Sequence, residues 1–127
     1  MAENQAVILD SNIIIELYKG NKRIRKRCES IGEQSLYISE ISVAEIYFGA
    51  LNKKEVTLIQ KHLDKFPWIP VNENISNIFT NLMIEYSLSH KPYIGDMLIA
   101  ATAIYYDIHL YTLNIKDFKF INGLKLY

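Results

Sequence analysis

Four acidic residues in this chain of 127 residues occupy places from which they could act together. Asp10 follows the first predicted strand directly, and Glu45 lies in the helix predicted after the second strand. Asp96 begins a strongly apolar helix, and Asp117 comes shortly after the strand predicted over residues 109–112. In folds with parallel strands, functional groups gather outside the carboxyl ends of the strands. The sequence therefore predicts four carboxylates at one rim of the sheet.

Carboxylates that lie close together repel one another and resist burial, so such a group requires a positive partner. Oxygen ligands without a cysteine or a nearby histidine favour a hard cation, Mg²⁺ or Mn²⁺. Such an ion lowers the pKa of bound water and neutralises phosphate charge, so it supports phosphodiester hydrolysis without a histidine base. His62, His90 and His109 share no metal-ligand spacing, and the chain has no glycine-rich phosphate loop. The pattern predicts metal-dependent phosphodiester hydrolysis.

Each acidic residue taken alone also has a structural explanation. Residues 42–45, Ser-Val-Ala-Glu, match a capping box, and Asn114 and Asp117 have the same spacing. Asp10 could cap the helix that follows it, and the helix dipole favours an acidic residue such as Asp96 in a first turn. Helix capping therefore remains an alternative to metal binding for each residue, and the joint placement of all four favours the metal site.

An alternation of strands and helices must position these residues. Apolar, β-branched runs predict the strands, and apolar residues at every third or fourth position predict the helices between them. This alternation indicates a three-layer α/β/α fold, in which helices cover both faces of a mainly parallel sheet of four to five short strands. A length of 127 residues and a mass of 14.8 kDa predict a single domain over residues 1–127. The strands are predicted over residues 6–9, 35–38, 68–71 and 109–112, with a further candidate at 124–126, and the helices around 13–17, 24–31, 39–50, 53–66, 75–86 and 97–106.

The charge of the chain is balanced as a whole but not along its length. Fourteen basic residues match fourteen acidic ones, yet six of the basic residues, including every arginine, fall in the nine positions 19–27. The rest of the chain carries eight basic against fourteen acidic residues, a net charge of minus six. This segment is either a solvated helix face or a phosphate-binding track beside the acidic rim. The candidate phosphate-binding residues in it are Lys22, Arg23, Arg25, Lys26 and Arg27.

Simpler features of the sequence exclude several classes of protein. No apolar run approaches the ~18 residues that a membrane-spanning helix requires. Residues 1–5 lack the basic start and apolar stretch of a signal peptide. We therefore expect a soluble, cytoplasmic protein without a membrane partner. Cys28 is the only cysteine, which excludes a disulfide within the chain and a cysteine-based zinc site, and we expect it to be a buried, inert thiol.

Four segments of the chain carry recognisable patterns, and they are residues 8–12, 38–46, 96–103 and 112–118. The third reads Asp-x-x-Ile-Ala-Ala from Asp96, and the fourth reads Thr-x-Asn-x-x-Asp-Phe from Thr112. These segments resemble the signature stretches of PIN-domain ribonucleases, and most closely those of the VapC toxins. They occur in the order of that family, and the resemblance extends from Val7 to about Phe120.

The resemblance implies a PIN-like fold and an endoribonuclease that depends on Mg²⁺ or Mn²⁺. It also implies supporting roles for Ser11, Thr112 and Asn114, whose hydroxyl and amide groups would orient ligands or water. Ser11 stands where many relatives have threonine, a change that keeps the hydroxyl. The catalytic and metal-binding residues implied by the resemblance are Asp10, Glu45, Asp96 and Asp117.

The resemblance further implies partners. VapC-like proteins are usually homodimers, and a small antitoxin holds them inactive by laying its C-terminal segment in a groove near the active site. The substrate would be tRNA or another structured RNA, and the basic segment would bind it. The alternative is a non-catalytic PIN-like module that binds RNA or a protein through the basic helix. The apolar residues that could line the antitoxin groove, or serve as core or dimer contacts, are Ile14, Leu17, Tyr18, Tyr47, Phe48 and Leu51.

Three tyrosines late in the chain have two interpretations. Tyr105, Tyr106 and Tyr111 could stack on the bases of an RNA. Aromatic packing within the protein is the more ordinary role for such residues, and we expect it here. A phosphatase is the least favoured enzyme class, because no second aspartate follows Asp10 two residues on.

Overall fold

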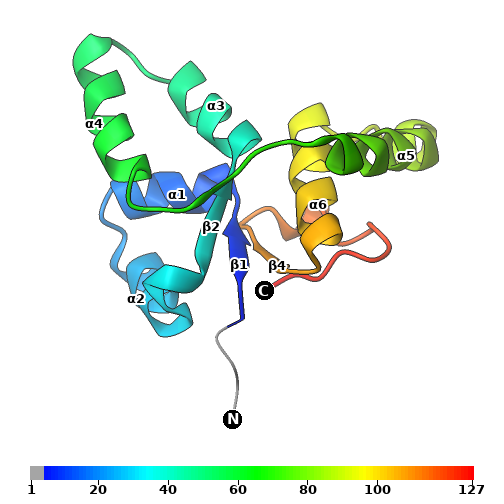
Figure 1. Ribbon diagram of the computed structural model, residues 1–127, viewed down its shortest axis with the longest axis horizontal. Coiled ribbons are helices and arrows are strands. Elements are labelled where there is room, and N and C mark those ends of the chain that lie inside the picture. Colours follow the sequence, from blue (N-terminus) through cyan, green and yellow to red (C-terminus); the bar gives the residue numbers. More distant parts are fainter. Residues whose placement is uncertain (1–4) are drawn as a thin grey trace.

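A parallel sheet of four short strands lies at the centre of the fold in this computed structural model, which describes residues 5–127 (Figure 1). The strands are β1 (Val7–Leu9), β2 (Leu36–Ser39), β3 (Trp68–Ile69) and β4 (His109–Tyr111). Their order in the sheet is β3-β2-β1-β4, and every neighbouring pair is parallel. In the register, Leu9 is the partner of Ile38 on one side and of Tyr111 on the other. The three strands that precede the candidate acidic segments therefore end at the same rim.

Six helices form the two outer layers. They are α1 (Ser11–Tyr18), α2 (Lys22–Ile31), α3 (Glu40–Phe48), α4 (Lys53–Leu63), α5 (Glu73–His90) and α6 (Ile94–Tyr106). Figure 1 shows α1 to α4 on one side of the strands and α5 with α6 on the other. Two short 3₁₀ turns, η1 (Glu33–Ser35) and η2 (Ile115–Asp117), complete the elements. The predicted three-layer α/β/α fold with a parallel sheet is confirmed.

The alternation of side chains along β1 explains why the sheet is covered on both faces. Val7 and Leu9 point into the core formed with α1, α2, α3 and α4, whereas Ile8 points into the core formed with α5 and α6. All three side chains are fully buried. A strand buried on both faces reads as a continuous apolar run, which is the pattern that predicted it. Two hydrophobic cores therefore fix the central strand and the segment that follows it.

Both edges of the sheet are short. Pro67 and Pro70 flank β3, which has two residues where four were predicted. At the other edge, the predicted strand over residues 124–126 is only a single bridge between Leu110 and Leu126. Around this bridge, the Leu110 backbone N–H donates to the carbonyl of Lys125, and the Tyr127 N–H donates to the carbonyl of Leu110. The C-terminal segment thus lies along β4 without forming a regular strand.

Helix ends agree with their predicted positions to within four residues. Helix α6 begins at Ile94, two residues before the predicted start at Asp96, so Asp96 lies inside its first turn. The Asn72 side chain accepts a hydrogen bond from the backbone N–H of Ile75 and caps α5. Within residues 5–127, no helix is long and apolar enough to cross a membrane. Residues 1–4, which belong to the polar start of the chain, lie outside the described residues.

Candidate active site

Asp10 lies at the junction of β1 and α1, where its carboxylate is held by three donors. Its Oδ1 accepts a hydrogen bond from the backbone N–H of Ser11 at 2.8 Å. Its Oδ2 accepts one from the Thr112 hydroxyl at 2.7 Å and one from the Asn12 amide at 3.3 Å. Burial nevertheless raises the pKa of Asp10, because the loss of solvation outweighs these hydrogen bonds. Asp10 therefore does cap α1, as one alternative predicted, but it also faces groups from the far end of the chain.

The loop after β4 is tied to the start of α1. Thr112 Oγ1, which donates to Asp10, accepts a hydrogen bond from the backbone N–H of Asn114 at 2.9 Å. The Asn12 side chain accepts another from the backbone N–H of Leu113 at 3.2 Å. The hydroxyl of Thr112 thus orients Asp10 directly. The Asn114 side chain forms no capping hydrogen bond to η2 and is exposed.

Asp96 is the electrostatic centre of the acidic group. Burial first, and then the charges of Asp10, Asp117 and Glu45 in that order of importance, together raise its pKa to about 7. These couplings require the four carboxylates to lie near one another, so the structure brings together all four predicted acidic residues. Because Asp96 lies in the first turn of α6, the end of that buried helix faces the same rim as the ends of the strands.

Glu45 reaches this rim from the middle of α3. It is not part of a capping box, because α3 begins at Glu40 and the Ser39 hydroxyl caps it by accepting a hydrogen bond from the Ser42 N–H at 3.2 Å. The capping alternative for Glu45 is therefore wrong. Partial burial raises the pKa of Glu45 and the charge of Asp10 adds to the rise, while the nearby Ser11 hydroxyl opposes it.

A glycine makes room for the Glu45 carboxylate. A Cβ atom placed on Gly95 would lie 2.5 Å from Glu45 Oε2 and 3.4 Å from its Cδ. Only a residue without a side chain allows the carboxylate this close to the first turn of α6. Gly95 immediately precedes Asp96, so the contact also determines how near Glu45 lies to the Asp96 backbone. The sequence reasoning missed Gly95, although its position directly before the Asp-x-x-Ile-Ala-Ala segment was visible.

Asp117 ends the 3₁₀ turn η2 and is half-buried. Its backbone N–H donates to the carbonyl of Asn114 at 2.9 Å. The predicted capping box of Asn114 and Asp117 does not form, because the Asn114 side chain makes no capping bond. The Asp117 carboxylate instead contributes to the raised pKa of Asp96.

The donor set of the acidic rim fits a hard divalent cation in its chemistry. All four candidate ligands are carboxylates, which are the oxygen ligands that Mg²⁺ and Mn²⁺ take. The two ion pairs found within residues 5–127, Lys19 with Glu16 and Lys125 with Asp107, involve none of the four. In the same part of the chain, no three acidic, histidine or cysteine side chains are already arranged as a closed set of metal ligands.

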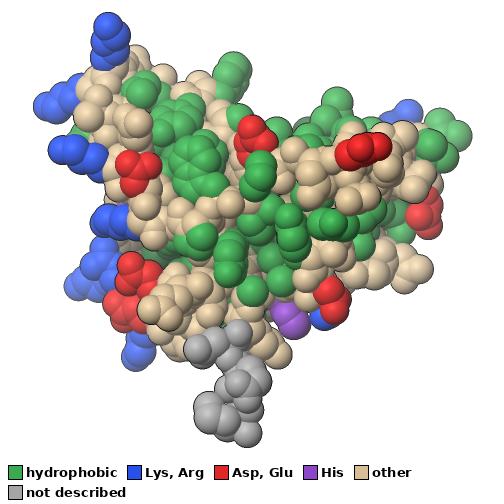
Figure 2. Space-filling model, in the orientation of Figure 1, with side chains coloured by type: hydrophobic (Ala, Val, Ile, Leu, Met, Phe, Trp, Pro, Cys, Tyr) green, Lys and Arg blue, Asp and Glu red, His purple; other side chains and the backbone are tan. Residues whose placement is uncertain are grey.

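The basic segment forms the exposed face of α2. Its five candidate residues are all exposed, whereas Ile24 and Cys28 are buried in the core. Burial raises the pKa of the Cys28 thiol to about 11, which agrees with the predicted inert thiol. Figure 2 shows Lys and Arg side chains gathered along the side of the molecule formed by α2 and α4.

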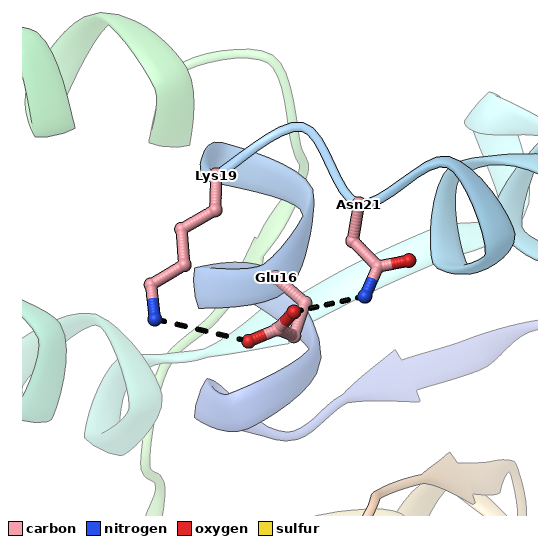
Figure 3. Close-up of polar contacts among 3 residues, drawn as sticks. All are labelled: Glu16, Lys19 and Asn21. Carbon is pink, nitrogen blue, oxygen red and sulfur yellow. Dashed lines mark hydrogen bonds and ion pairs between the residues drawn. The ribbon is translucent and has the colours of Figure 1, made fainter.

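The turn between α1 and α2 is held by one acidic side chain. Glu16 forms an ion pair with Lys19 at 3.9 Å and accepts a hydrogen bond from the Asn21 amide at 2.9 Å (Figure 3). Asn21 in turn caps α2 by accepting a hydrogen bond from the Ile24 N–H. These contacts fix the start of the basic helix relative to α1, which begins at the acidic rim.

An apolar groove of about 290 Å³ runs between α1, α3 and α4 and reaches Glu45. Of the six residues predicted for such a groove, Ile14 and Tyr18 line it. The other four do not: Leu17 lines a neighbouring pocket, Tyr47 is partly buried, and Phe48 and Leu51 are exposed.

His62 of α4 also lines the groove, and the sequence reasoning missed it. Its ring packs edge-on against Tyr18 and Phe66, at centroid distances of 5.4 and 5.6 Å. Its Nε2 is buried without a hydrogen-bond partner in the described residues, and burial lowers the pKa of the imidazole. His62 belongs to no sequence motif, so only the fold shows that it lines the groove.

The three late tyrosines pack against protein groups. Tyr105 and Tyr106 contact each other edge-on, with ring centroids 4.8 Å apart, at the end of α6 that lies away from Asp96. Tyr111 is buried in the core beside β1. Aromatic packing, the expected role, therefore describes all three.

Comparison with known proteins agrees with this geometry. The family model described as PIN domain matches residues 7–121 of the chain. The chain belongs to the PIN-domain family. This PIN domain is 37% identical over 130 residues to Ribonuclease VapC1 of Rickettsia felis, covering 94% of this chain and 93% of that protein. It is 32% identical over 121 residues to Ribonuclease VapC10 of Mycobacterium tuberculosis, covering 94% of this chain and 90% of the relative.

Solved structures share the fold of this PIN domain over nearly its whole length. VapBC2 from Rickettsia felis, bound to a DNA fragment from its promoter, has a TM-score of 0.85 at 25% identity and covers 96% of this chain and 97% of the other. A toxin–antitoxin complex from Klebsiella pneumoniae has a TM-score of 0.76 at 30% identity, with coverages of 94% and 95%. The resemblance to the VapC group of PIN domains is thereby confirmed.

Proposed function

We propose that this PIN domain is a metal-dependent endoribonuclease and the toxin of a toxin–antitoxin pair. The observation that carries the proposal is the meeting of four carboxylates from four separate segments, where burial and then the charges of the other three raise the pKa of Asp96 to about 7. A fold gains nothing in stability from such a cluster, and groups with raised pKa values gather at functional sites. The names of the similar VapC proteins supply the substrate class, RNA.

Each side chain has a definable role in this proposal. Asp10 is the most rigid candidate ligand, because three donors fix its carboxylate. Asp96 and Glu45 would face the cation from α6 and α3, with Gly95 setting the position of Glu45. Asp117 would complete the set from η2. When bound, Mg²⁺ or Mn²⁺ would supply a water of lowered pKa and neutralise phosphate charge.

The proposal is tested by incubating the purified chain with total RNA and with tRNA. We expect cleavage with added Mg²⁺ or Mn²⁺, and loss of cleavage with EDTA or with Asp96→Asn. Cleavage that is indifferent to both treatments would refute the metal-dependent mechanism. RNA binding without cleavage at any metal concentration, retained when Asp10 and Asp96 are neutralised, would instead indicate a non-catalytic binding module.

We propose that the groove between α1, α3 and α4 receives an apolar segment of a small antitoxin. The groove is mostly apolar, and Glu45 lies on its wall, so an occupant would cover one candidate ligand. Ile15→Asp would place a charge in the groove, because Ile15 lines it and is 37% exposed, and we expect this variant to weaken complex formation with the antitoxin. Val56→Asp, on the same side of the sheet but outside the groove, is the control. Equal complex formation by both variants would contradict this placement.

We also propose a homodimer. Ile84 and Leu88 lie one helical turn apart on α5 and are 73% and 87% exposed, so the single chain leaves an apolar strip uncovered. Leu88→Glu should convert the dimer to a monomer in sedimentation experiments, while Glu85→Gln should leave it unchanged. A wild-type chain that sediments as a monomer would refute the proposal.

A further inference from the structure

The basic segment of α2 is divided between different surfaces. Arg23 and Arg27, one helical turn apart, both line a pocket between α2 and the loop that follows β4. Arg25 lines a different pocket, together with the acidic residues Glu29 and Glu33. Lys22 and Lys26 do not line the first pocket. The fold therefore separates two arginines from the other basic residues of the same helix.

We name this first space the Arg23–Arg27 pocket. It has a volume of about 470 Å³, and its far wall consists of Thr112, Leu113, Ile115 and Tyr127. This volume is within the range of roughly 300 to 1,000 Å³ that small-molecule sites have, and it is sufficient for one nucleotide. Thr112 also donates to Asp10 at 2.7 Å. The pocket and the acidic rim therefore share a wall.

Arg27 is held in position by aromatic rings rather than by an acidic partner. Its guanidinium carbon lies 4.9 Å from the ring centroid of Tyr127 and 5.8 Å from that of Tyr111. The two rings contact each other at a centroid distance of 5.3 Å. Stacking on a ring fixes the guanidinium plane and leaves the N–H groups at its edge available.

Within residues 5–127, no carboxylate forms an ion pair with either arginine of the pocket. Both ion pairs within the described part of the chain involve lysines, and neither includes Arg23 or Arg27. The Glu16 side chain, the acidic group at the start of α2, is engaged by Lys19 and Asn21 instead (Figure 3). Two guanidinium groups that line one pocket, one of them oriented by aromatic rings, form a binding site for an anion, and phosphate matches guanidinium geometry well.

We propose that the Arg23–Arg27 pocket binds one nucleotide of a single-stranded RNA, next to the phosphodiester bond held at the acidic rim. Arg23 and Arg27 contact its phosphate, and the exposed side chains of Leu113 and Ile115 contact its base or ribose. Single-stranded RNA is favoured over duplex RNA, because unpaired nucleotides can enter a pocket of this size. This inference deepens the proposed ribonuclease function and rests on it for the identity of the ligand.

The test measures binding of a fluorescently labelled single-stranded RNA of mixed sequence to the full chain in EDTA, where the proposed cleavage does not occur. We expect the double variant Arg23→Ala/Arg27→Ala to bind about tenfold more weakly. The double variant Arg25→Ala/Lys26→Ala removes the same charge from the same helix and is the matched control. Its affinity for the RNA should fall by about twofold or less. Circular dichroism melting checks that each variant is folded.

The salt dependence of binding gives a second readout. Each phosphate neutralised on a single strand contributes about 0.7 to the slope of log K against log salt, and both arginines contact the same phosphate, so the first double variant should lower the slope by about 0.7. Equal losses in both double variants would overturn the proposal, because they would show a diffuse charge effect. Absence of RNA binding by the unchanged chain, with EDTA and with Mg²⁺, would also overturn it. Weaker binding of the antitoxin without weaker binding of RNA would assign the pocket to a protein partner and overturn it as well.

Tyr127 tests the positioning of Arg27. Tyr127→Ala should weaken RNA binding about threefold, and Tyr127→Phe, which keeps the ring, should not. The effect of Tyr127→Ala should disappear when Arg27 is already alanine, since the ring acts through the guanidinium. Additive effects would refute that coupling. If the chain cleaves no RNA with any metal but the Arg23→Ala/Arg27→Ala variant still loses binding selectively, the ribonuclease proposal fails and the pocket assignment stands.

Discussion

The Glu45 carboxylate occupies the space that a side chain at Gly95 would fill. A Cβ atom on Gly95 would lie 2.5 Å from Glu45 Oε2, a distance too short for any real contact of that kind. The atom that must move is the end of a flexible side chain, so a larger residue at position 95 would displace the carboxylate without breaking the fold. A substitution at Gly95 should therefore change the geometry of the acidic rim without lowering the stability of the domain.

Gly95→Ala should reduce RNA cleavage and leave the fold intact. Alanine favours a helix over glycine by roughly 0.5 to 1 kcal/mol, so the free energy of unfolding should stay the same or increase slightly. Displacement of a ligand by about 1 Å can cost up to about 100-fold in rate, so we expect the cleavage rate to fall by at least tenfold. Gly49→Ala is the matched control, because its new Cβ would meet its nearest neighbour at 3.6 Å, an ordinary contact. Full activity of Gly95→Ala would show that the Glu45 position does not matter.

Asp96→Asn should stabilise the metal-free chain. The folded-state pKa of Asp96 is about 7 against an ordinary value of 3.8, so between these pH values the folded state binds more protons than the unfolded state. The contribution of Asp96 to stability therefore falls as pH rises from about 4 to 7 and remains unfavourable above that. Removing the charge should increase the free energy of unfolding by about 2 kcal/mol at pH 8, after allowance for partial solvent exposure.

Urea denaturation in EDTA at several pH values measures this effect. The gain from Asp96→Asn should be small near pH 4 and largest above pH 7. Asp64→Asn, at the exposed end of α4, removes an equal charge away from the rim and should change stability little at any pH. A loss of stability in Asp96→Asn at high pH would support the helix-dipole role of Asp96 instead.

Mg²⁺ should raise the melting temperature of the unchanged chain. A ligand that binds only the folded state increases the free energy of unfolding by about 2.7 kcal/mol when its concentration is one hundred times its Kd. For a domain of this size, that amounts to several degrees, at roughly 3 °C per kcal/mol. Asp96→Asn should abolish the increase, although it raises the starting temperature. An equal increase with Mg²⁺ in both proteins would place the bound ion elsewhere.

Thr112→Val should destabilise the charged form of the Asp10 carboxylate. The substitution keeps the shape of the side chain but removes the hydroxyl that donates to Asp10 Oδ2 at 2.7 Å. Loss of one hydrogen-bond donor to a buried carboxylate should lower the free energy of unfolding by about 1 to 3 kcal/mol at neutral pH. The pKa of Asp10, already raised by burial, should rise further, so the acidic limb of the pH profile of cleavage should move to higher pH.

Thr112→Ser keeps the hydroxyl and is expected to restore both stability and the pH profile. Thr102→Val is a second control, because the Thr102 hydroxyl donates to the Leu98 carbonyl within α6 and not to an acidic residue. A pH profile of Thr112→Val identical to that of the unchanged chain would show that this hydroxyl does not orient Asp10 during cleavage.

The layers of the fold could be predicted from the sequence because hydrophobic pattern and burial coincide. Val7, Ile8 and Leu9 form a continuous apolar run, and each is buried against one of the two helical layers. The two-residue length of β3 and the single bridge at Leu126 could not be predicted, since edge pairing depends on where neighbouring segments run.

The acidic rim could be predicted in its members but not in its local contacts. Two serines three residues apart, Ser39 and Ser42, could each have capped α3. Because β2 ends at Ser39 and α3 begins at the next residue, Ser39 is the cap. The sequence pattern alone therefore suggested a capping box that does not form. The contacts between Gly95 and Glu45, and between Arg27 and Tyr127, join segments far apart in the chain, so no local pattern could show them.

The C-terminal segment along β4 determines how copies of this molecule can associate. Because Lys125 and Tyr127 satisfy the outward-facing backbone groups of Leu110, that strand cannot accept a strand from another chain there. At the opposite edge, β3 is two residues long and is followed by Pro70, which has no N–H to donate. The sheet is therefore protected against edge-to-edge aggregation on both sides, and assembly with other chains is left to the helices.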